Sequence, residues 1–278
     1  MSRQVQGRLK SLSVEGQTDR GIHYRVSGRN HAPALVLLHP LGASSGTWQP
    51  QLAEFERFFR VVCVDLRGHG GSRVKDGASQ HAAPRACTLQ DLADDALDVL
   101  DVLGIDRAHW CGLSIGGVMA LQVAVTAPRR VLRLVLANTA AVFSPPSMWD
   151  ERIETARTQG LAPLWAAIPE RWFSAGYRAR ETAEVERIKS LWVDTQVQGY
   201  IEACSALREV DLRPRLVEVQ APTLVISSAQ DLATSIERAD ELADGISGAD
   251  LLVLDAGHLS NVEQAAEFTT AVVDFLRD

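Results

Sequence analysis

Short apolar runs alternate along most of the chain with longer stretches whose apolar residues recur every three or four positions. The apolar runs predict buried strands at residues 34–38, 60–64, 108–111, 131–137 and 222–228, and a further strand that ends near Leu254. Helical spacing predicts helices at residues 89–103, 117–125 and 264–276, the first with Thr88 and Asp91 at capping positions and Gly104 at its end. Strands that alternate with helices imply right-handed crossovers and a doubly wound, mostly parallel sheet.

Three segments near this core have a different character. Residues 9–14 and 22–26 favour two antiparallel edge strands, joined through residues 15–17. The glycine-rich segment 65–72 is typical of a tight turn that serves the scaffold. Residues 74–86 are polar and without periodicity, which predicts a surface loop.

After Thr139 the chain becomes rich in Trp, Arg and Glu and shows helical spacing without a convincing strand. This stretch contains four of the six tryptophans, Trp149, Trp165, Trp172 and Trp192. A helical insertion between two strands, above the carboxyl edge of the sheet, is expected to be a cap or lid. We therefore expect a core domain of residues 1–140 and 218–278, with a cap of residues 141–217 whose tryptophans mostly form its own core.

The segment Gly112-Leu113-Ser114-Ile115-Gly116 places a serine between two glycines, directly after a strand and before a helix. A strand-to-helix turn this sharp needs small neighbours, and it lifts the serine hydroxyl clear of the sheet. A turn that merely happens to contain Gly and Ser would show the same five residues. The pattern therefore predicts a nucleophile only if a base and an acid accompany it.

Both partners follow Ser114 in the order typical of such sites, acid before histidine. Asp231 lies just beyond the strand 222–228, and His258 lies on a short loop between the strand ending near Leu254 and the last helix. The exit of strand 131–137 carries Asn138, which cannot supply a carboxylate, so Asp231 has no rival there. The alternatives are an Asp231 that caps a helix starting at Thr234 or Ser235, and a His258 without a role.

A negatively charged tetrahedral intermediate needs two convergent N–H donors. Ile115 supplies one at the start of its helix, and Leu41 supplies the other, because Pro40 of the segment His39-Pro40-Leu41-Gly42 has no N–H. His39 is interpreted as a structural histidine that braces this loop.

Composition limits the remaining possibilities. The chain of 278 residues is 46% hydrophobic, which suits one large α/β domain with an insertion. Its net charge of −7 argues against nucleic acid and anionic membranes as partners, although clustered arginines can still bind an anionic small molecule. The four cysteines lack the spacing of a zinc site or a disulfide framework, so we expect no metal and no cofactor. A polar N-terminus and the absence of long apolar runs favour a cytoplasmic protein, and the oligomeric state is left open.

Several stretches together resemble the α/β-hydrolase fold family, and within it the 3-oxoadipate enol-lactonases of aromatic-compound breakdown. They are residues 39–42 with Trp48, 112–117, 137–141, 149–153, 170–173, 206–208 and 257–264. The resemblance implies a mostly parallel eight-stranded sheet with a helical cap, and Ser114, Asp231 and His258 as the catalytic triad. The loop at Asp231 departs from the family, because it lacks the glycine before and the proline after that carboxylate.

The enzyme class that the resemblance implies is a carboxylic ester hydrolase working through an acyl-enzyme on a small lactone, whose carboxylate would need a cation from the cap. Candidate substrate-binding residues are Trp149, Arg152, Arg171, Trp172 and Arg178, with Arg208 as a further cation. The alternatives are another lactonase or carboxylesterase, a cofactor-free perhydrolase, and a non-catalytic ligand receptor on a hydrolase scaffold.

Overall fold

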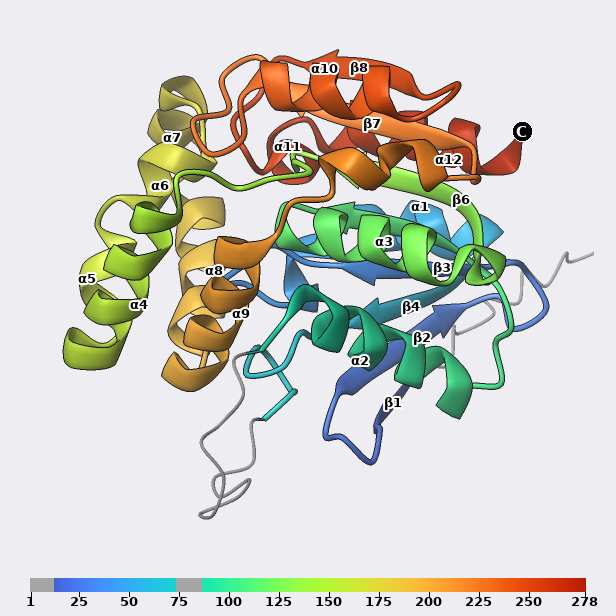
Figure 1. Cartoon of the computed structure of the whole chain (residues 1–278), viewed down its shortest axis with the longest axis horizontal. Helices are drawn as coiled ribbons and strands as arrows, with labels where there is room; N and C mark the ends of the chain where they lie inside the picture. The colour runs from blue at the N-terminus through green and yellow to red at the C-terminus, as the bar shows by residue number, and fades with distance from the viewer. Residues whose placement is uncertain (1–12, 74–86) are drawn as a thin grey trace, which may run out of the picture.

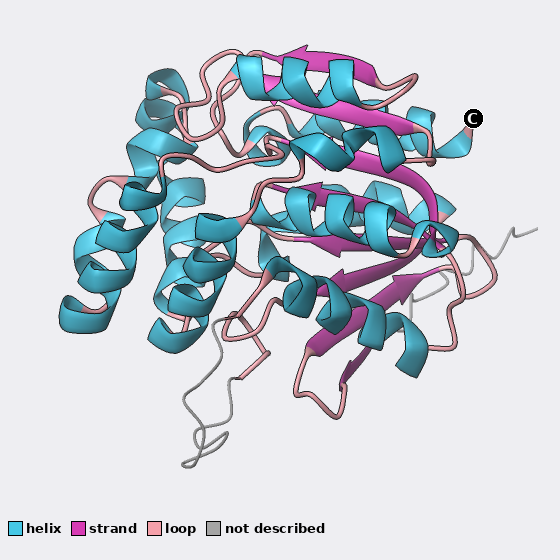
Figure 2. Cartoon of the chain, in the orientation of Figure 1, coloured by secondary structure: helices cyan, strands magenta, loops and turns pink. Residues whose placement is uncertain are grey.

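A computed structural model describes residues 13–73 and 87–278. Its centre is an eight-stranded sheet in the order β1-β2-β4-β3-β5-β6-β7-β8 (Figure 2). The strands are β1 (Val14–Gln17), β2 (His23–Gly28), β3 (Ala34–Leu38), β4 (Arg60–Val64), β5 (Ala108–Leu113), β6 (Val131–Ala137), β7 (Thr223–Ser228) and β8 (Asp250–Leu254). Pairing is antiparallel from β1 through β2 to β4 and parallel from β4 to β8, so the expected mostly parallel sheet is confirmed.

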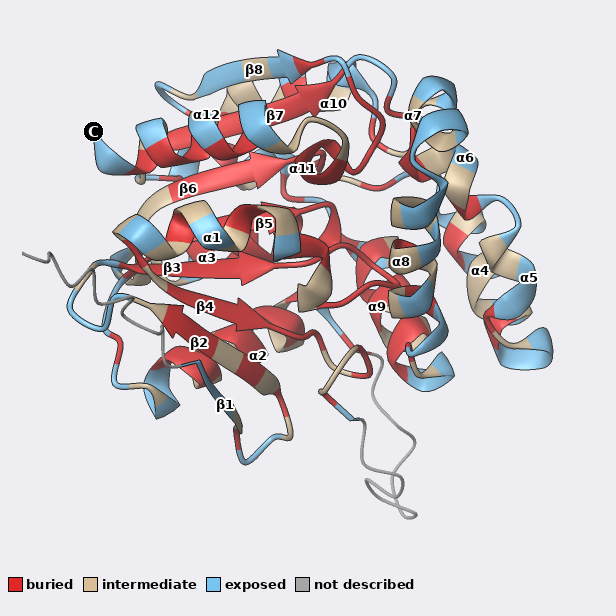
Figure 3. Ribbon diagram, turned by 180° about the vertical axis from the view of Figure 1, so that it is seen from behind, coloured by how far each residue is buried: buried red, intermediate tan, exposed pale blue. Residues whose placement is uncertain are grey.

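Helices cover both faces of this sheet. One face carries α2 (Leu89–Val102), α3 (Ile115–Thr126) and α10 (Ile236–Gly245), and the other carries α1 (Gln49–Phe58) and α12 (Ala265–Arg277) (Figure 1). Short helices η1 (Ser45–Trp48), η2 (Pro128–Arg130), η3 (Arg213–Glu218) and α11 (Ser260–Glu263) complete the connections. The inner strands are buried, whereas β1 and β8 at the two edges are largely exposed (Figure 3). Within the described ranges, no helix has both the length and the apolar composition needed to cross a membrane.

The α-helices between β6 and β7 gather at the side of the sheet toward which the parallel strands point (Figure 1). They are α4 (Pro146–Gln159), α5 (Ala162–Trp165), α6 (Ile168–Trp172), α7 (Ala175–Arg180), α8 (Thr182–Val193) and α9 (Val197–Glu209). We call them the α4–α9 layer. The rings of Trp165, Trp172 and Trp192 pack against one another, whereas Trp149 packs against Phe143. The carboxyl ends of the parallel strands therefore lie under this layer.

The first hairpin differs from expectation. Residues 15–17, expected to form the turn, belong to β1 and pair with β2. Gly16 indicated a turn, but it lies opposite Tyr24, whose ring fills the space where a Cβ would stand. The chain reverses instead at Thr18–Gly21, where Gly21 has a φ of 81°. The expected strand at 9–14 falls mostly outside the described residues, as does the loop expected at 74–86.

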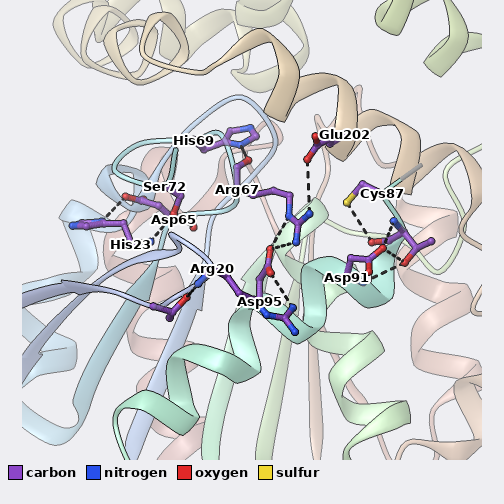
Figure 4. Close-up of polar contacts among 12 residues, drawn as sticks. Arg20, His23, Asp65, Arg67, His69, Ser72, Cys87, Asp91, Asp95 and Glu202 are labelled. Atoms are coloured by element: carbon purple, nitrogen blue, oxygen red, sulfur yellow. Dashed lines mark hydrogen bonds and ion pairs between the residues drawn. The ribbon is translucent and has the colours of Figure 1, made fainter. Parts of the chain in front are cut away.

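The turn after β4 is organised by a buried carboxylate, Asp65 (Figure 4). Its oxygens accept from the N–H groups of Ser45 (2.7 Å) and Gly71 (2.9 Å) and lie 2.9 Å from Nδ1 of His23. Burial opposes the charge, but His23 and these donors outweigh it and hold the pKa of Asp65 well below its ordinary value. The same ion pair raises the pKa of His23. The segment 65–72 is thus a braced turn, as its glycines suggested.

Asp65→Asn should change how stability depends on pH. A depressed pKa means that the carboxylate stabilises the fold above its ordinary value of 3.8, and that this contribution is lost as the pH falls through the folded-state pKa. We expect the variant to be about 1–3 kcal/mol less stable at neutral pH, because it loses a charged acceptor. Its Tm should then fall less steeply than that of the wild type below pH 3.8.

Thermal unfolding followed by circular dichroism from pH 2.5 to 8 measures both effects. Asp240→Asn, which removes an exposed carboxylate, should keep the wild-type profile. If the Tm of the wild type and of Asp65→Asn fell equally steeply at acidic pH, the stabilising role of the Asp65 carboxylate would be contradicted.

Candidate active site

Ser114 occupies a strained turn between β5 and α3, with a φ of 58° and a ψ of −120°. Such a conformation is rare for a residue with a side chain and is retained only where the surroundings impose it. The two flanking glycines explain how it fits. A Cβ on Gly112 would stand 2.1 Å from the Gly116 carbonyl oxygen, and one on Gly116 would stand 2.2 Å from that of Leu38. The close approach of α3 to the sheet therefore requires glycine at both positions.

Hydrogen bonds hold the Ser114 backbone from both sides. Its N–H donates to the Ala137 carbonyl at the end of β6 (2.9 Å). Its carbonyl accepts from the N–H groups of Gly117 (2.9 Å) and Val118 (3.1 Å) and from the Thr139 hydroxyl (2.6 Å). The side chain points to the side on which a cavity opens, and Ser114 lines that cavity.

His258 and Asp231 meet as a buried pair. His258 Nδ1 lies 2.8 Å from Asp231 Oδ2, and the imidazole is 2% exposed. The same carboxylate oxygen accepts from Asn138 Nδ2 (3.0 Å) and the Thr234 hydroxyl (2.7 Å), while Oδ1 accepts from the N–H groups of Ala233 and Thr234. Burial alone would raise the pKa of Asp231, but His258 and these donors outweigh it, and the pKa lies below its ordinary value. Asp231 is therefore held as a carboxylate facing the imidazole.

Ser114 and His258 line the same cavity, so the three residues that the sequence singled out converge. Among the described residues, no hydrogen bond joins the Ser114 hydroxyl to His258. Without a bound substrate such contacts are often long and tighten only when the reacting group enters. Asp231 does not cap the following helix, because that helix begins after Ser235. Its carboxylate oxygens instead accept hydrogen bonds from its own loop and face His258.

Leu41 and Ile115 are the two residues expected to supply N–H donors next to Ser114. Leu41 lines the cavity, and its N–H has no hydrogen-bond partner among the described residues. Ile115 is the first residue of α3, and the N–H groups of a first helical turn have no partner within the helix. Both N–H groups therefore remain able to donate to a ligand atom.

The loop that carries Leu41 is braced by two neutral histidines. The Leu66 N–H donates to His39 Nε2 (2.9 Å), so His39 carries its proton on Nδ1, which lies 2.8 Å from the Pro40 carbonyl. His69 repeats this arrangement, accepting from the Gly42 N–H at Nε2 and donating to the Arg67 carbonyl. Burial lowers the pKa of both, that of His69 to about 3. His39 is thus a structural residue, in agreement with the sequence interpretation.

The loop of His258 is clamped between the core and the α4–α9 layer. Glu263 accepts from the N–H groups of Gly257 (3.0 Å) and Ser174 (2.7 Å) and from the Ser174 hydroxyl (2.7 Å). The Leu259 N–H donates to the Trp172 carbonyl (3.0 Å). A Cβ on Gly257 would stand 2.8 Å from that same carbonyl, so only glycine lets the loop approach the layer so closely.

A cavity of about 450 Å³ joins these groups to the α4–α9 layer. Four of the expected binding residues line it: Trp149, Arg152, Arg171 and Trp172. Two expectations are not met. Neither Arg178 nor Arg208 lines the cavity: Arg178 pairs with Glu170, while Arg208 is partly exposed and pairs with Asp150 and Glu209. Trp192 and Arg238, which the sequence did not single out, also line the cavity.

Two of the three arginines that line the cavity, Arg152 and Arg171, lack carboxylate partners within the described part of the chain, whereas Arg238 pairs with Glu241. Arg152 lies over the Trp149 ring, 5.3 Å from its centroid, and makes a long hydrogen bond of 3.4 Å to the Tyr200 hydroxyl. Arg171 makes no ion pair and no hydrogen bond with the described residues. Burial, and then repulsion by Arg152, lowers the pKa of Arg171. The cavity thus contains two guanidinium groups that no carboxylate neutralises within the described part of the chain.

The chain was compared with known protein families, curated proteins and solved structures. The family model of the alpha/beta hydrolase fold matches residues 33–265. The chain belongs to the α/β-hydrolase fold family. It is 34% identical to 3-oxoadipate enol-lactonase 1 of Acinetobacter baylyi, in an alignment that covers 97% of this chain and 98% of that protein. It is 31% identical to a putative carbamate hydrolase RutD of Agrobacterium fabrum, with 92% of this chain and 98% of that protein aligned.

A solved structure agrees with these relatives. The enol-lactonase from Burkholderia xenovorans LB400 superposes with a TM-score of 0.89 at 39% identity, covering 95% of this chain and all of that one. This α/β hydrolase is therefore an enzyme of the hydrolase class, similar to the 3-oxoadipate enol-lactonases.

The site contains supporting residues that sequence reasoning missed. Asn138 was noted only because it cannot act as an acid, yet it bonds both Asp231 and Ser228, and accepts from the Ser260 hydroxyl. It has a φ of 43°, a conformation that asparagine tolerates better than most residues. An asparagine directly after a buried strand was the available signal. No sequence signal indicated the roles of the other two residues. Thr234 contacts Asp231 within an irregular loop, and Glu263 contacts Ser174, which is distant in the sequence.

Removing the Glu263 carboxylate should loosen the His258 loop. Glu263→Ala leaves the N–H groups of Gly257 and Ser174 without their acceptor, which should lower stability by about 1–3 kcal/mol. Turnover should fall by about tenfold or more, because a small misplacement of a reacting group is costly. Ester hydrolysis and thermal unfolding measure the two effects, with Glu267→Ala, an exposed carboxylate on α12, as the control. Unchanged turnover in Glu263→Ala would refute the positioning role.

Proposed function

We propose that this enzyme is a serine hydrolase that opens a small lactone bearing a carboxylate, with 3-oxoadipate enol-lactone as the first candidate. One observation carries the proposal: a single cavity combines Ser114 and His258 with two guanidinium groups that lack carboxylate partners among the described residues. The names of the relatives supply the candidate substrate. A place in the breakdown of aromatic compounds is what the resemblance of the sequence implies.

Ester cleavage would proceed in two steps. His258 takes the Ser114 proton as Oγ attacks the lactone carbonyl, and the N–H groups of Leu41 and Ile115 bind the resulting oxyanion. When the intermediate collapses, the ring C–O bond breaks and the enol oxygen leaves with the proton from His258. Water then attacks the acyl-enzyme by the same route, with His258 as base, and releases Ser114. Asp231 holds the imidazole through Nδ1 and stabilises its positive charge.

Arg171 is the stronger candidate to bind the substrate carboxylate. It lines the cavity and has neither an ion pair nor a hydrogen bond with the described residues, whereas Arg152 already contacts Trp149 and Tyr200. A guanidinium group holds a carboxylate through two parallel hydrogen bonds. Residues 141–217 would act as a cap that supplies this cation and the tryptophan walls, and that shields the acyl-enzyme from bulk water.

The same site could act on other substrates, and a comparison of hydrolysis rates distinguishes them. The carbamate hydrolase relatives make a carbamate one alternative, and a neutral small ester is another. Rates on the enol-lactone, p-nitrophenyl acetate and a simple carbamate would separate them. A non-catalytic receptor would turn over none of the three.

Ser114→Ala should lower kcat by about a thousandfold or more while the protein stays folded. The expected loss follows from removing the nucleophile, and the remaining rate comes from binding and from the oxyanion donors. Hydrolysis of the enol-lactone, labelling by a fluorophosphonate and circular dichroism measure the variant. Ser190→Ala, an exposed serine on α8, should behave as wild type. Turnover or labelling that survives in Ser114→Ala would refute the nucleophile.

Arg171→Met should discriminate between charged and neutral substrates. For a carboxylate-bearing lactone we expect kcat/KM to fall about 10- to 100-fold, mainly through KM, because a charge-assisted hydrogen bond is lost. For a neutral lactone of the same ring size the change should be small. Arg178→Met, which removes an arginine outside the cavity, is the matched control. Equal losses on both lactones would exclude a carboxylate-binding role.

A further inference from the structure

Trp192 on α8 lies at the centre of the aromatic cluster. The residue is 2% exposed, and its ring centroid lies 5.8 Å from Trp165, 6.0 Å from Trp172 and 5.4 Å from Tyr200. Its indole N–H donates to the Leu161 carbonyl (3.3 Å). These contacts fix the ring in one orientation.

The indole separates two hollow spaces. On one side lies the cavity of about 450 Å³ that contains Ser114 and His258. On the other lies an outer pocket of about 360 Å³ between α5, α8 and the start of α9. Among the described residues, Trp192 alone lines both spaces. Its side chain is therefore the partition between them.

The outer pocket is mostly apolar. Its lining includes Leu161, Ala162, Trp165, Val193 and Val197. Val193 is 70% exposed and Val197 38% exposed. Lys189 and Thr195 are the polar residues of the lining, and the apolar majority suits a hydrocarbon chain.

The partition stands next to the proposed oxyanion loop. A Cβ on Gly42 would lie 2.4 Å from Cζ3 of the Trp192 ring, so the indole packs directly on the Gly42 backbone. Leu41, the neighbouring residue, carries one of the two N–H donors proposed above. The wall is thus close to the reacting carbonyl, where the size of a substrate group matters most.

We propose that Trp192 is a specificity-determining residue that restricts the enzyme to short acyl groups and small rings, by closing the active-site cavity against the outer apolar pocket. This inference rests on the proposed ester hydrolysis. A substrate with a longer alkyl chain meets the indole face, and the space that would receive its end lies directly behind that face. A smaller residue at position 192 joins the two spaces and admits the chain.

The test compares p-nitrophenyl esters of acetate, butyrate, hexanoate and octanoate in four proteins: wild type, Trp192→Ala, Trp172→Ala and Trp165→Ala. In the wild type, kcat/KM should fall with chain length. In Trp192→Ala, the ratio of kcat/KM for octanoate to that for acetate should rise about 10- to 100-fold. The ratio is the readout, because loss of the ring beside Gly42 is expected to lower the rate on every ester.

The two other tryptophans are matched controls. Trp172 lines the inner cavity only and Trp165 the outer pocket only, so each substitution leaves the Trp192 ring in place between the two spaces. Their ratios should stay within about threefold of the wild type. A rise in Trp172→Ala equal to that in Trp192→Ala would overturn the proposal, because general enlargement of the cavity would then explain the gain.

A large cavity can prevent folding, so Trp192→Leu accompanies Trp192→Ala and should show a smaller rise of the same ratio. Circular dichroism establishes that each variant is folded. An unchanged ratio in a folded Trp192 variant, in a protein whose wild type hydrolyses p-nitrophenyl acetate, would overturn the partition and leave the proposed function intact. A wild type that hydrolyses no ester would overturn both.

Discussion

The close approach of α3 to the sheet is the constraint on which the site depends. It is possible because Gly112 and Gly116 have no side chains, and it forces Ser114 into a conformation that costs about 1–3 kcal/mol. That cost is offset by bonds on both sides of the serine, from Ala137 at the end of β6 and from Thr139 just beyond it. The same approach brings the first N–H of α3 beside the serine hydroxyl. The position of the Ser114 hydroxyl and the N–H donor beside it therefore both result from the close approach of α3 to the sheet.

Buried polar contacts extend this order to the neighbouring strand ends. Asp231, Asn138 and Ser260 form a connected set under the α4–α9 layer, and each buried oxygen of Asp231 has donors. A buried carboxylate without such donors would be protonated or would destabilise the fold. Glu263 then ties the His258 loop to Ser174 of the layer. The orientation of the imidazole therefore depends on the layer as well as on the core.

Local patterns predicted the parts of the molecule that local forces determine. The strands, the capping box of α2 at Thr88 and Asp91, and the serine turn all follow from short-range spacing. Gly16 was misread because its lack of a side chain serves Tyr24 across the hairpin, which is a long-range cause. Long-range packing also decides which of the candidate arginines reach the cavity. Trp149 and Arg152 are three positions apart and share a face of α4, a usable signal, whereas the separation of Arg178 from the cavity depends on how short helices pack.

Two parts of the cavity wall make different demands on a ligand. Two guanidinium groups near one another and near tryptophan rings are costly, because each is partly desolvated and each repels the other. An anion that enters relieves both costs, and the surrounding indoles strengthen its attraction by excluding water. The part of the wall formed by Trp192, whose indole packs on Gly42, carries no charge, so in the role proposed above it selects by shape. Under the function and the role of Trp192 proposed above, a small anionic molecule suits both walls, whereas a long neutral chain suits neither.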